Sequence, residues 1–292
     1  MPQVNTAKLK ASNRQAGRKI GGTIAIFSVL LVVGAFMLFP IYLTVVMSVK
    51  PVEELFIFPP KLYAMRPTID NFSDMFDALN SNRVPFSRYV FNSVAVTVSV
   101  TVLQCIFCSM AAFVLAKCRF PGSKFINGVI VVSLLYQSNV IYIMQYIVMA
   151  KLGLIDNPLA LILPSIASPM GLFLMRQSIS QIPDSMIEAA KVDGAGLFRI
   201  CWQIVMPNQK PALMTLIIFA FQAAWNIQGG SLIFQEQYKT LPTVVMQAAS
   251  SGLARAGVAM AAAVFMLVPP IVIFTLAQRQ VIETMAHSGI KE

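Results

Sequence analysis

The residues with the most specific spacing form one short string: Glu188-Ala189-Ala190-Lys191-Val192-Asp193-Gly194-Ala195. Ser185, three positions before Glu188, fits a capping box, so a short helix is predicted to begin there. Gly194 can adopt the positive φ that commonly ends a helix, and a second helix is predicted from about Leu197 to Pro207. The string therefore predicts a stiff unit of two helices joined by a turn. Such a unit suits the transmission of force from a partner rather than catalysis.

The chain lacks the residue patterns of catalysis. There is no G-x-x-x-x-G-K-[S/T] for nucleotide binding and no H-E-x-x-H or G-x-S-x-G, and His287 is the only histidine. Cys105 and Cys108 form a C-x-x-C within an apolar stretch, where small packing residues are a better interpretation than a redox or metal site. We therefore predict no catalytic residue, no metal and no cofactor.

The composition is that of a membrane protein. Of 292 residues, 57% are hydrophobic and 12% are charged, against roughly 25% charged in a typical soluble domain. About 20 apolar residues are needed per helical span, and six stretches approach or exceed that length. The predicted fold class is all-α integral membrane with six transmembrane helices, near residues 21–49, 92–116, 125–149, 158–175, 213–227 and 257–278.

The distribution of charge predicts the topology. With both termini inside, 14 of the 22 lysines and arginines lie in inner segments and 8 in outer ones, as the positive-inside rule requires. This gives a cytoplasmic basic segment at 1–20, a membrane domain at 21–278 with its main cytoplasmic loop at about 176–211, and a cytoplasmic tail at 279–292. No basic patch is interleaved with aromatic residues, so nucleic acid is not expected as a partner.

The string resembles the EAA loop of ATP-binding-cassette import permeases, whose pattern also has prolines at the positions of Pro207 and Pro211, 19 and 23 residues after Glu188. Departures from the family pattern are Cys201, Met206 and the segment 227–230. Further landmarks are similar to the carbohydrate, MalG-type branch of that family: Phe58-Pro59-Pro60, Asn71-Phe72, Asn92-Ser93, Arg119-Phe120-Pro121-Gly122, Leu152-Gly153-Leu154 and Trp225-Asn226.

The resemblance implies a type I importer permease in a bacterial cytoplasmic membrane. Its partners would be a second, homologous permease subunit in a heterodimer, two ATP-binding-cassette ATPase subunits that bind the ATP, and an extracytoplasmic solute-binding protein. The ATPase-docking residues implied by the match are Glu188, Ala189, Ala190, Asp193, Gly194, Ala195 and Pro207.

Uncharged polar residues within the apolar stretches are candidates for a translocation path. A hydroxylated solute such as a sugar needs hydrogen-bonding partners and a flat apolar surface. Interhelical hydrogen bonds, worth about 0.6 kcal/mol each, explain the same residues without any solute, and both interpretations stay open. The candidates are Gln104, Gln137, Asn139, Gln145, Gln222, Trp225 and Asn226.

The favoured function is import of a sugar or oligosaccharide. A non-sugar solute such as glycerol phosphate is an alternative, because segment 227–230 departs from the pattern of the branch. A secondary carrier fits less well, since ion-coupled carriers usually place ionisable groups inside their spans, and a membrane scaffold is the remaining non-transport alternative.

Overall fold

The computed structural model describes residues 20–80, 84–135, 138–250 and 256–289, and within these ranges it is helical with no strand. The elements are α2 (Ile20–Ser48), α3 (Val52–Leu55), α4 (Asp70–Asn80), α5 (Phe86–Lys117), α6 (Ser123–Ser133), α7 (Ser138–Lys151), α8 (Leu159–Ile166), α9 (Pro169–Ser180), α10 (Asp184–Val192), α11 (Leu197–Arg199), the π-helical η1 (Ile200–Val205), α12 (Met206–Asn208), α13 (Lys210–Trp225), the 3-10 turn η2 (Glu236–Tyr238), α14 (Leu241–Ala249) and α15 (Ala256–Gly289).

The predicted all-helical membrane fold is confirmed. The described residues contain fewer continuous helical spans than the six that were predicted. By length and composition, the described residues contain four helical spans: Ile24–Ser48, Phe86–Lys117, Leu159–Ser180 and Ala256–Gln278. A fifth is counted if Leu197–Asn208 and Lys210–Trp225, bent by 89°, form one span. The predicted span at 125–149 is divided between α6 and α7, of 11 and 14 residues, each too short to cross a bilayer alone.

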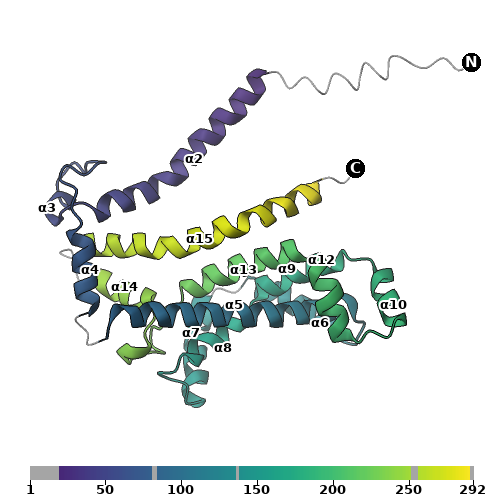
Figure 1. The fold of residues 1–292 in the computed structure, drawn as a ribbon. Helices are drawn as coiled ribbons and strands as arrows, with labels where there is room; N and C mark the ends of the chain where they lie inside the picture. The colour runs from purple at the N-terminus through teal and green to yellow at the C-terminus, as the bar shows by residue number, and fades with distance from the viewer. Residues whose placement is uncertain (1–19, 81–83, 136–137, 251–255, 290–292) are drawn as a thin grey trace, which may run out of the picture.

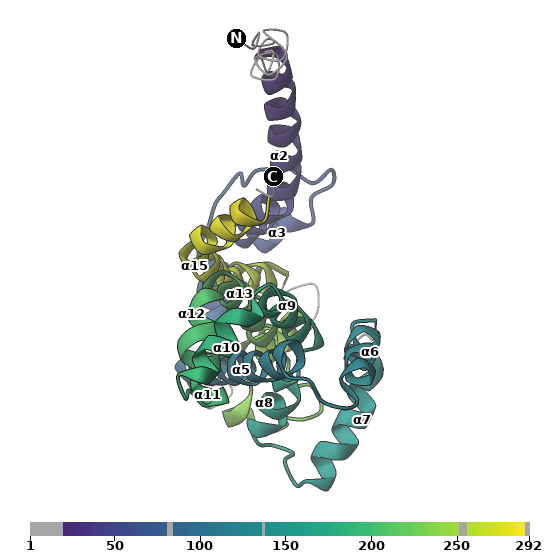
Figure 2. The same cartoon turned by 90° about the vertical axis from the view of Figure 1, so that its right-hand side faces the viewer.

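The helices α5, α9, α13 and α15 run alongside one another and form the body of the molecule (Figure 1). Helices α10 to α12 lie at one end of this body, and α3, α4 and α14 lie at the other. Helix α2 diverges from the body, and none of its apolar window is buried within the chain. Figure 2 shows that α6 and α7 also stand to one side of the body.

Helix α5 is the axis of the fold because it contributes to all three apolar clusters. Near its start, Tyr89 packs with residues of α4, α14 and α15. Val96 and Val100 pack against α8 and Leu232 and Ile233 of the loop after α13. Near its end, Phe113 joins a cluster that includes buried residues of α9, α10, η1 and α13. One rigid helix therefore connects the end that carries α10 to the opposite end of the body.

Candidate functional site

The N-cap of α10 lies two residues earlier than predicted, at Pro183 instead of Ser185, and the start of the helix is built differently. Asp184 is its first residue and Pro183 (φ −61°) is its N-cap, with no side-chain cap hydrogen bond. Ser185 therefore lies inside the helix, and the predicted capping box between Ser185 and Glu188 is wrong. The physical reason is that Pro183 already fixes the extended entry into the helix, and the acidic Asp184 suits the positive end of the helix dipole.

The end of α10 is as predicted, with Gly194 at φ +79°. The amide of Ala195 donates to Ala190 O at 3.0 Å, and the amide of Gly194 donates to Lys191 O at 3.0 Å. This pair of bonds is a Schellman motif, in which the residue after the helix end takes the left-handed conformation. Any side chain at Gly194 would carry a conformational cost of roughly 1–2 kcal/mol, so the turn itself requires glycine.

The predicted docking residues divide between the two faces of α10. Ile187 and Ala190 are buried in the cluster with α9 and η1, whereas Glu188 and Ala189 are exposed. Burial at positions 187 and 190 is the i, i+3 spacing of one helix face. Asp193 is exposed, and Ala195 packs at the edge of the same cluster. One face thus attaches α10 to the body and leaves the other uncovered.

Large apolar side chains on the uncovered side were not singled out from the sequence. Val192 is 88% exposed and Phe198 68% exposed, and Leu197 is also exposed. The three residues flank the Gly194 turn from both of its helices. Apolar side chains gathered beside a rigid turn are typical of a protein interface.

The second helix of the predicted pair is present but irregular. Residues 197–208 pass from α11 through the π-helical η1 into α12, and Pro207 lies in the first turn of α12 with its side chain exposed. The chain then turns by 89° at Gln209 into α13. Any displacement of the helix pair is therefore applied directly to a helix of the body.

Lys117, the last residue of α5, fixes the start of α10. Its Nζ donates to Ile182 O at 2.5 Å and Ser180 O at 3.5 Å, and it lies 2.7 Å from Asp184 Oδ1. The lysine side chain is 6% exposed and the Asp184 side chain 70% exposed. This buried cation binds the carbonyl of the last residue of α9, a carbonyl of the loop that follows and the first carboxylate of α10, so it joins three helices at one point.

The charge of this junction affects Asp184. The hydrogen bond from Lys117, with the nearby charges of Lys117, Arg119 and Lys191, lowers the pKa of the Asp184 carboxyl below its usual value of 3.8. A crevice of about 410 Å³ lies beside the pair, and Glu188 and Leu197 also line it. Helix α10 and the end of α5 therefore share one charged recess.

The translocation-path candidates lie on separate elements and in different environments. Gln104 of α5 is buried against Gly171 of α9. The two residues are so close that a Cβ atom added to Gly171 would lie 3.3 Å from Gln104 Nε2. Gln145 on α7 is half-buried and lines a cavity of about 790 Å³ with residues of α8 and α9. Gln222 and Asn226 share an exposed face at the end of α13, where Asn226 Nδ2 donates to Gln222 O at 2.8 Å.

Trp225 has a packing role within this chain. It is 3% exposed, and its Nε1 donates to Met266 O of α15 at 3.1 Å. Its ring is stacked on Phe221, with centroids 6.1 Å apart. Gln137 lies outside the described residues, and Asn139 lies in α7 but its side chain is not described. The path assignment of all seven candidates stays a prediction.

Sequence reasoning used Lys117 only as a topological charge and did not recognise its structural role. A signal was available, because a lysine in the last turn of a long helix is well placed to bind free carbonyls. The particular carbonyls, 63 and 65 residues further along the chain, follow only from the packing of α9 against α5.

These features define a class of protein: a polytopic helical membrane protein that presents a rigid helical turn and exposed apolar residues at one end of its body. The comparisons specify it further. The family model for "binding-protein-dependent transport system inner membrane component" matches residues 23–287, and the chain belongs to this family. The resemblance to ATP-binding-cassette import permeases is thereby confirmed.

Two curated permeases and one solved transporter structure are similar to this chain over most of its length. The chain is 29% identical over 277 residues to the sn-glycerol-3-phosphate transport system permease protein UgpE of Yersinia enterocolitica, covering 89% of this chain and 95% of that one. It is 29% identical over 272 residues to UgpE of Escherichia coli O1:K1 / APEC, covering 91% and 97%. A bacterial ABC transporter involved in the import of the acidic polysaccharide alginate has the same fold, with TM-score 0.72, 22% identity, and 90% and 97% of the two chains covered.

Proposed function

We propose that this chain is one of two homologous permease subunits of an ATP-driven importer, with α10 docked on a separate ATPase subunit at the cytoplasmic face. The observation that supports this most is the exposed, glycine-ended α10, attached to α5 and α9 by its opposite face and by Lys117. ATP is bound and hydrolysed by the two ATPase subunits, and an extracytoplasmic binding protein delivers the solute to the opposite end.

The proposed solute is a sugar or oligosaccharide, and glycerol phosphate is the specific alternative. The alginate importer has a similar fold, whereas the similar UgpE proteins are named for sn-glycerol-3-phosphate. Gln145 of α7 lines a cavity of about 790 Å³ and supplies an uncharged polar group for hydroxyls, whereas Gln104 is buried between α5 and α9. Uptake into proteoliposomes with the cognate binding protein, tested with radiolabelled sugars and with glycerol phosphate, decides between the two.

Docking is tested by replacing Gly194 with valine. Gly194 has φ +79° and open space around its Cβ position, so Gly194→Val strains only the backbone of the turn. Since a strain of roughly 1–2 kcal/mol displaces α10 from its docking position, solute uptake should fall about tenfold while ATP hydrolysis continues. The measurement is the ratio of solute imported to ATP hydrolysed in proteoliposomes.

Gly196→Val is the matched control. Gly196 lies two residues further along, with φ −69° and equally open space, so valine is compatible with its backbone. Wild-type coupling in both variants would contradict docking through this turn. Uptake from this chain alone, driven by an ion gradient without any ATPase, would instead establish a secondary carrier.

A further inference from the structure

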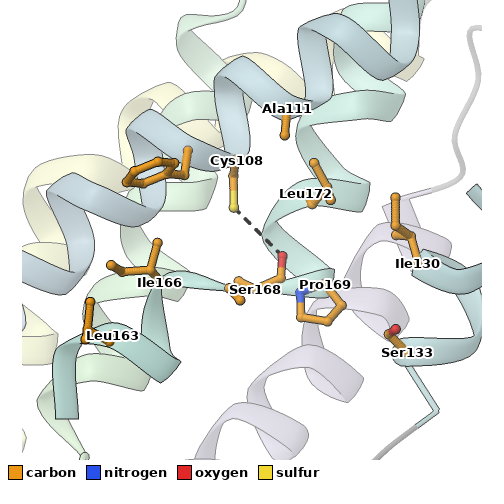
Figure 3. Close-up of a pocket in the computed structure, with 11 residues that line it drawn as sticks. Cys108, Ala111, Ile130, Ser133, Leu163, Ile166, Ser168, Pro169 and Leu172 are labelled. Atoms are coloured by element: carbon orange, nitrogen blue, oxygen red, sulfur yellow. Dashed lines mark hydrogen bonds between the residues drawn. The ribbon is translucent and has the colours of Figure 1, made fainter. Parts of the chain in front are cut away.

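A groove between α5, α6 and α9 has a basic end and an apolar end. The basic end is a cavity of about 490 Å³ beside the loop at 118–122, on the side of the molecule that carries α10. The apolar end is a cavity of about 510 Å³ between α6 and the body of the helices (Figure 3). Successive turns of α5, α6 and α9 line both cavities, and Leu163 and Ile166 of α8 line the apolar one as well.

The continuity follows from the lining residues. On α9, Arg176 lines the basic cavity and Leu172 the apolar one. On α5 the corresponding residues are Leu115 and Ala111, and on α6 they are Asn127 and Ile130. A separation of three or four residues is about 4.5–6 Å along a helix axis, so the cavities adjoin end to end.

The basic end carries an excess of positive charge, although one of its three cations, Arg119, also lies near the Asp184 carboxylate of the crevice beneath α10. Arg119, Lys124 and Arg176 line the basic end, without a carboxylate among the described lining residues. Within the ranges that the structure describes, none of the three forms an ion pair. The start of α6 adds to this charge, because its N-cap Gly122 has no side chain to accept the first amides and its first turn has no acidic residue.

Two buried polar atoms also lack partners at the basic end. Arg176 Nε, a donor, and Asn127 Oδ1, an acceptor, are both buried and make no hydrogen bond among the described residues. An unpaired buried donor or acceptor is costly. A phosphate oxygen satisfies the arginine, and a headgroup hydroxyl satisfies the amide oxygen.

The apolar end matches a hydrocarbon chain. Phe107, Ala111 and Leu172 line it, and Figure 3 shows Ile130 and Ser133 of α6 on its far side. The Cys108 thiol is directed to Ser168 O at 3.8 Å, so this polar pair is satisfied internally. From Lys124 to Ser133 the α6 side of the groove extends about 13 Å at the helical rise per residue, enough for much of one acyl chain.

From this arrangement we propose that the groove binds an anionic phospholipid of the inner leaflet, with its phosphate among Arg119, Lys124 and Arg176 and an acyl chain between α5, α6 and α9. Arg119 also lines the crevice beneath α10, so the headgroup lies next to the docking element. The site does not depend on which solute is imported, nor on docking through Gly194.

The test is native mass spectrometry of the assembled transporter, purified from nanodiscs that contain equal amounts of phosphatidylglycerol and phosphatidylcholine. Each basic residue near a charged lipid surface contributes about a fivefold preference for anionic lipid. The wild-type complex should therefore retain phosphatidylglycerol in clear preference. The triple variant Arg119→Gln, Lys124→Gln, Arg176→Gln should lose that preference, whereas Lys210→Gln, which removes a cation outside the groove, should keep it.

The acyl half is tested by Ala111→Phe, which fills the groove without a change of charge and should lower lipid retention about tenfold. Soluble glycerol phosphate and inorganic phosphate should not displace the bound lipid; displacement by either would assign the basic end to a free anion and overturn the proposal. Equal retention by the triple variant and the wild type would do the same. So would an intact complex with no bound lipid, which would mean that the second permease subunit fills the groove.

Discussion

The two ends of α5 hold distant parts of the chain in chemically different ways. At the end that our proposed topology places outside, here called the outer end, Asn92 Nδ2 donates to Gln237 O at 2.8 Å and Lys239 O at 3.0 Å, and Ser93 Oγ accepts from the amide of Leu241 at 2.7 Å. At the opposite end, here called the inner end, the charged Lys117 binds the last residue of α9, the loop that follows it and the first residue of α10.

The difference lies in charge and exposure. Asn92 and Ser93 are both buried and neutral, and their partners are backbone groups. Lys117 is buried but charged, and its partner Asp184 is exposed at the surface that we propose to meet the ATPase. A neutral buried joint is insensitive to an approaching partner, whereas an exposed carboxylate responds to the charges that the partner brings. The outer joint therefore fixes the fold, and the inner joint connects the fold to its surroundings.

The largest effect in this comparison is expected from Lys117→Met. Methionine keeps the length of the apolar stem but removes every bond to Ser180, Ile182 and Asp184. The loss of a charged donor to these carbonyls, of which that of Ile182 is partly buried, costs about 1–3 kcal/mol, and it frees the start of α10. Solute imported per ATP hydrolysed should fall at least fivefold, measured in proteoliposomes.

Two controls define the role of Lys117. Lys117→Arg retains a donor and should recover part of the coupling, while Lys210→Met removes an inner cation elsewhere and should change nothing. If Lys117→Met lowers the thermal stability of the complex but leaves the coupling ratio intact, the lysine is only a structural tie, and the comparison between the two ends of α5 fails.

A smaller and different effect is expected from Asn92→Leu at the outer end. The variant leaves Lys239 O without its Asn92 donor and leaves Gln237 O with only the longer bond of 3.4 Å from Arg88 Nε, at a cost of about 1–3 kcal/mol in the free energy of unfolding. The thermal unfolding midpoint of the complex should fall, while each remaining folded complex keeps its wild-type coupling ratio. A changed ratio would show that the outer joint also transmits motion, and the contrast would disappear.

The parts of the molecule that the sequence predicts well are those set by local rules. Apolar length identified the all-helical membrane fold, and Gly194 marked the end of α10 because the residue just after a helix commonly takes a positive φ, which favours glycine. The start of α10 was misread as a capping box because Ser185 and Glu188 have the right spacing, whereas Pro183 takes the N-cap position.

Features that depend on long-range packing were not predictable. Trp225 could be placed on a helix face, but its burial against Met266 depends on how α13 meets α15. Lys117 binds carbonyls more than 60 residues away. Hydropathy could not predict that the 125–149 stretch is divided into α6 and α7, because both helices are apolar and together resemble one continuous span.

The smallest effect is expected from Asp184→Asn. The amide keeps an oxygen as an acceptor for Lys117, and the side chain is exposed, so uptake should change about twofold at most.

Because Lys117 lowers the pKa of Asp184, the ion pair stabilises the junction at pH values above the ordinary value of 3.8 and is lost as the pH falls through the lowered pKa. Coupling in the wild type should therefore be constant between about pH 5 and 8 with respect to this group. The measurement is the coupling ratio of the wild type and of Asp184→Asn across that range. If Asp184→Asn loses as much coupling as Lys117→Met, the carboxylate, and not the two carbonyls, anchors α10.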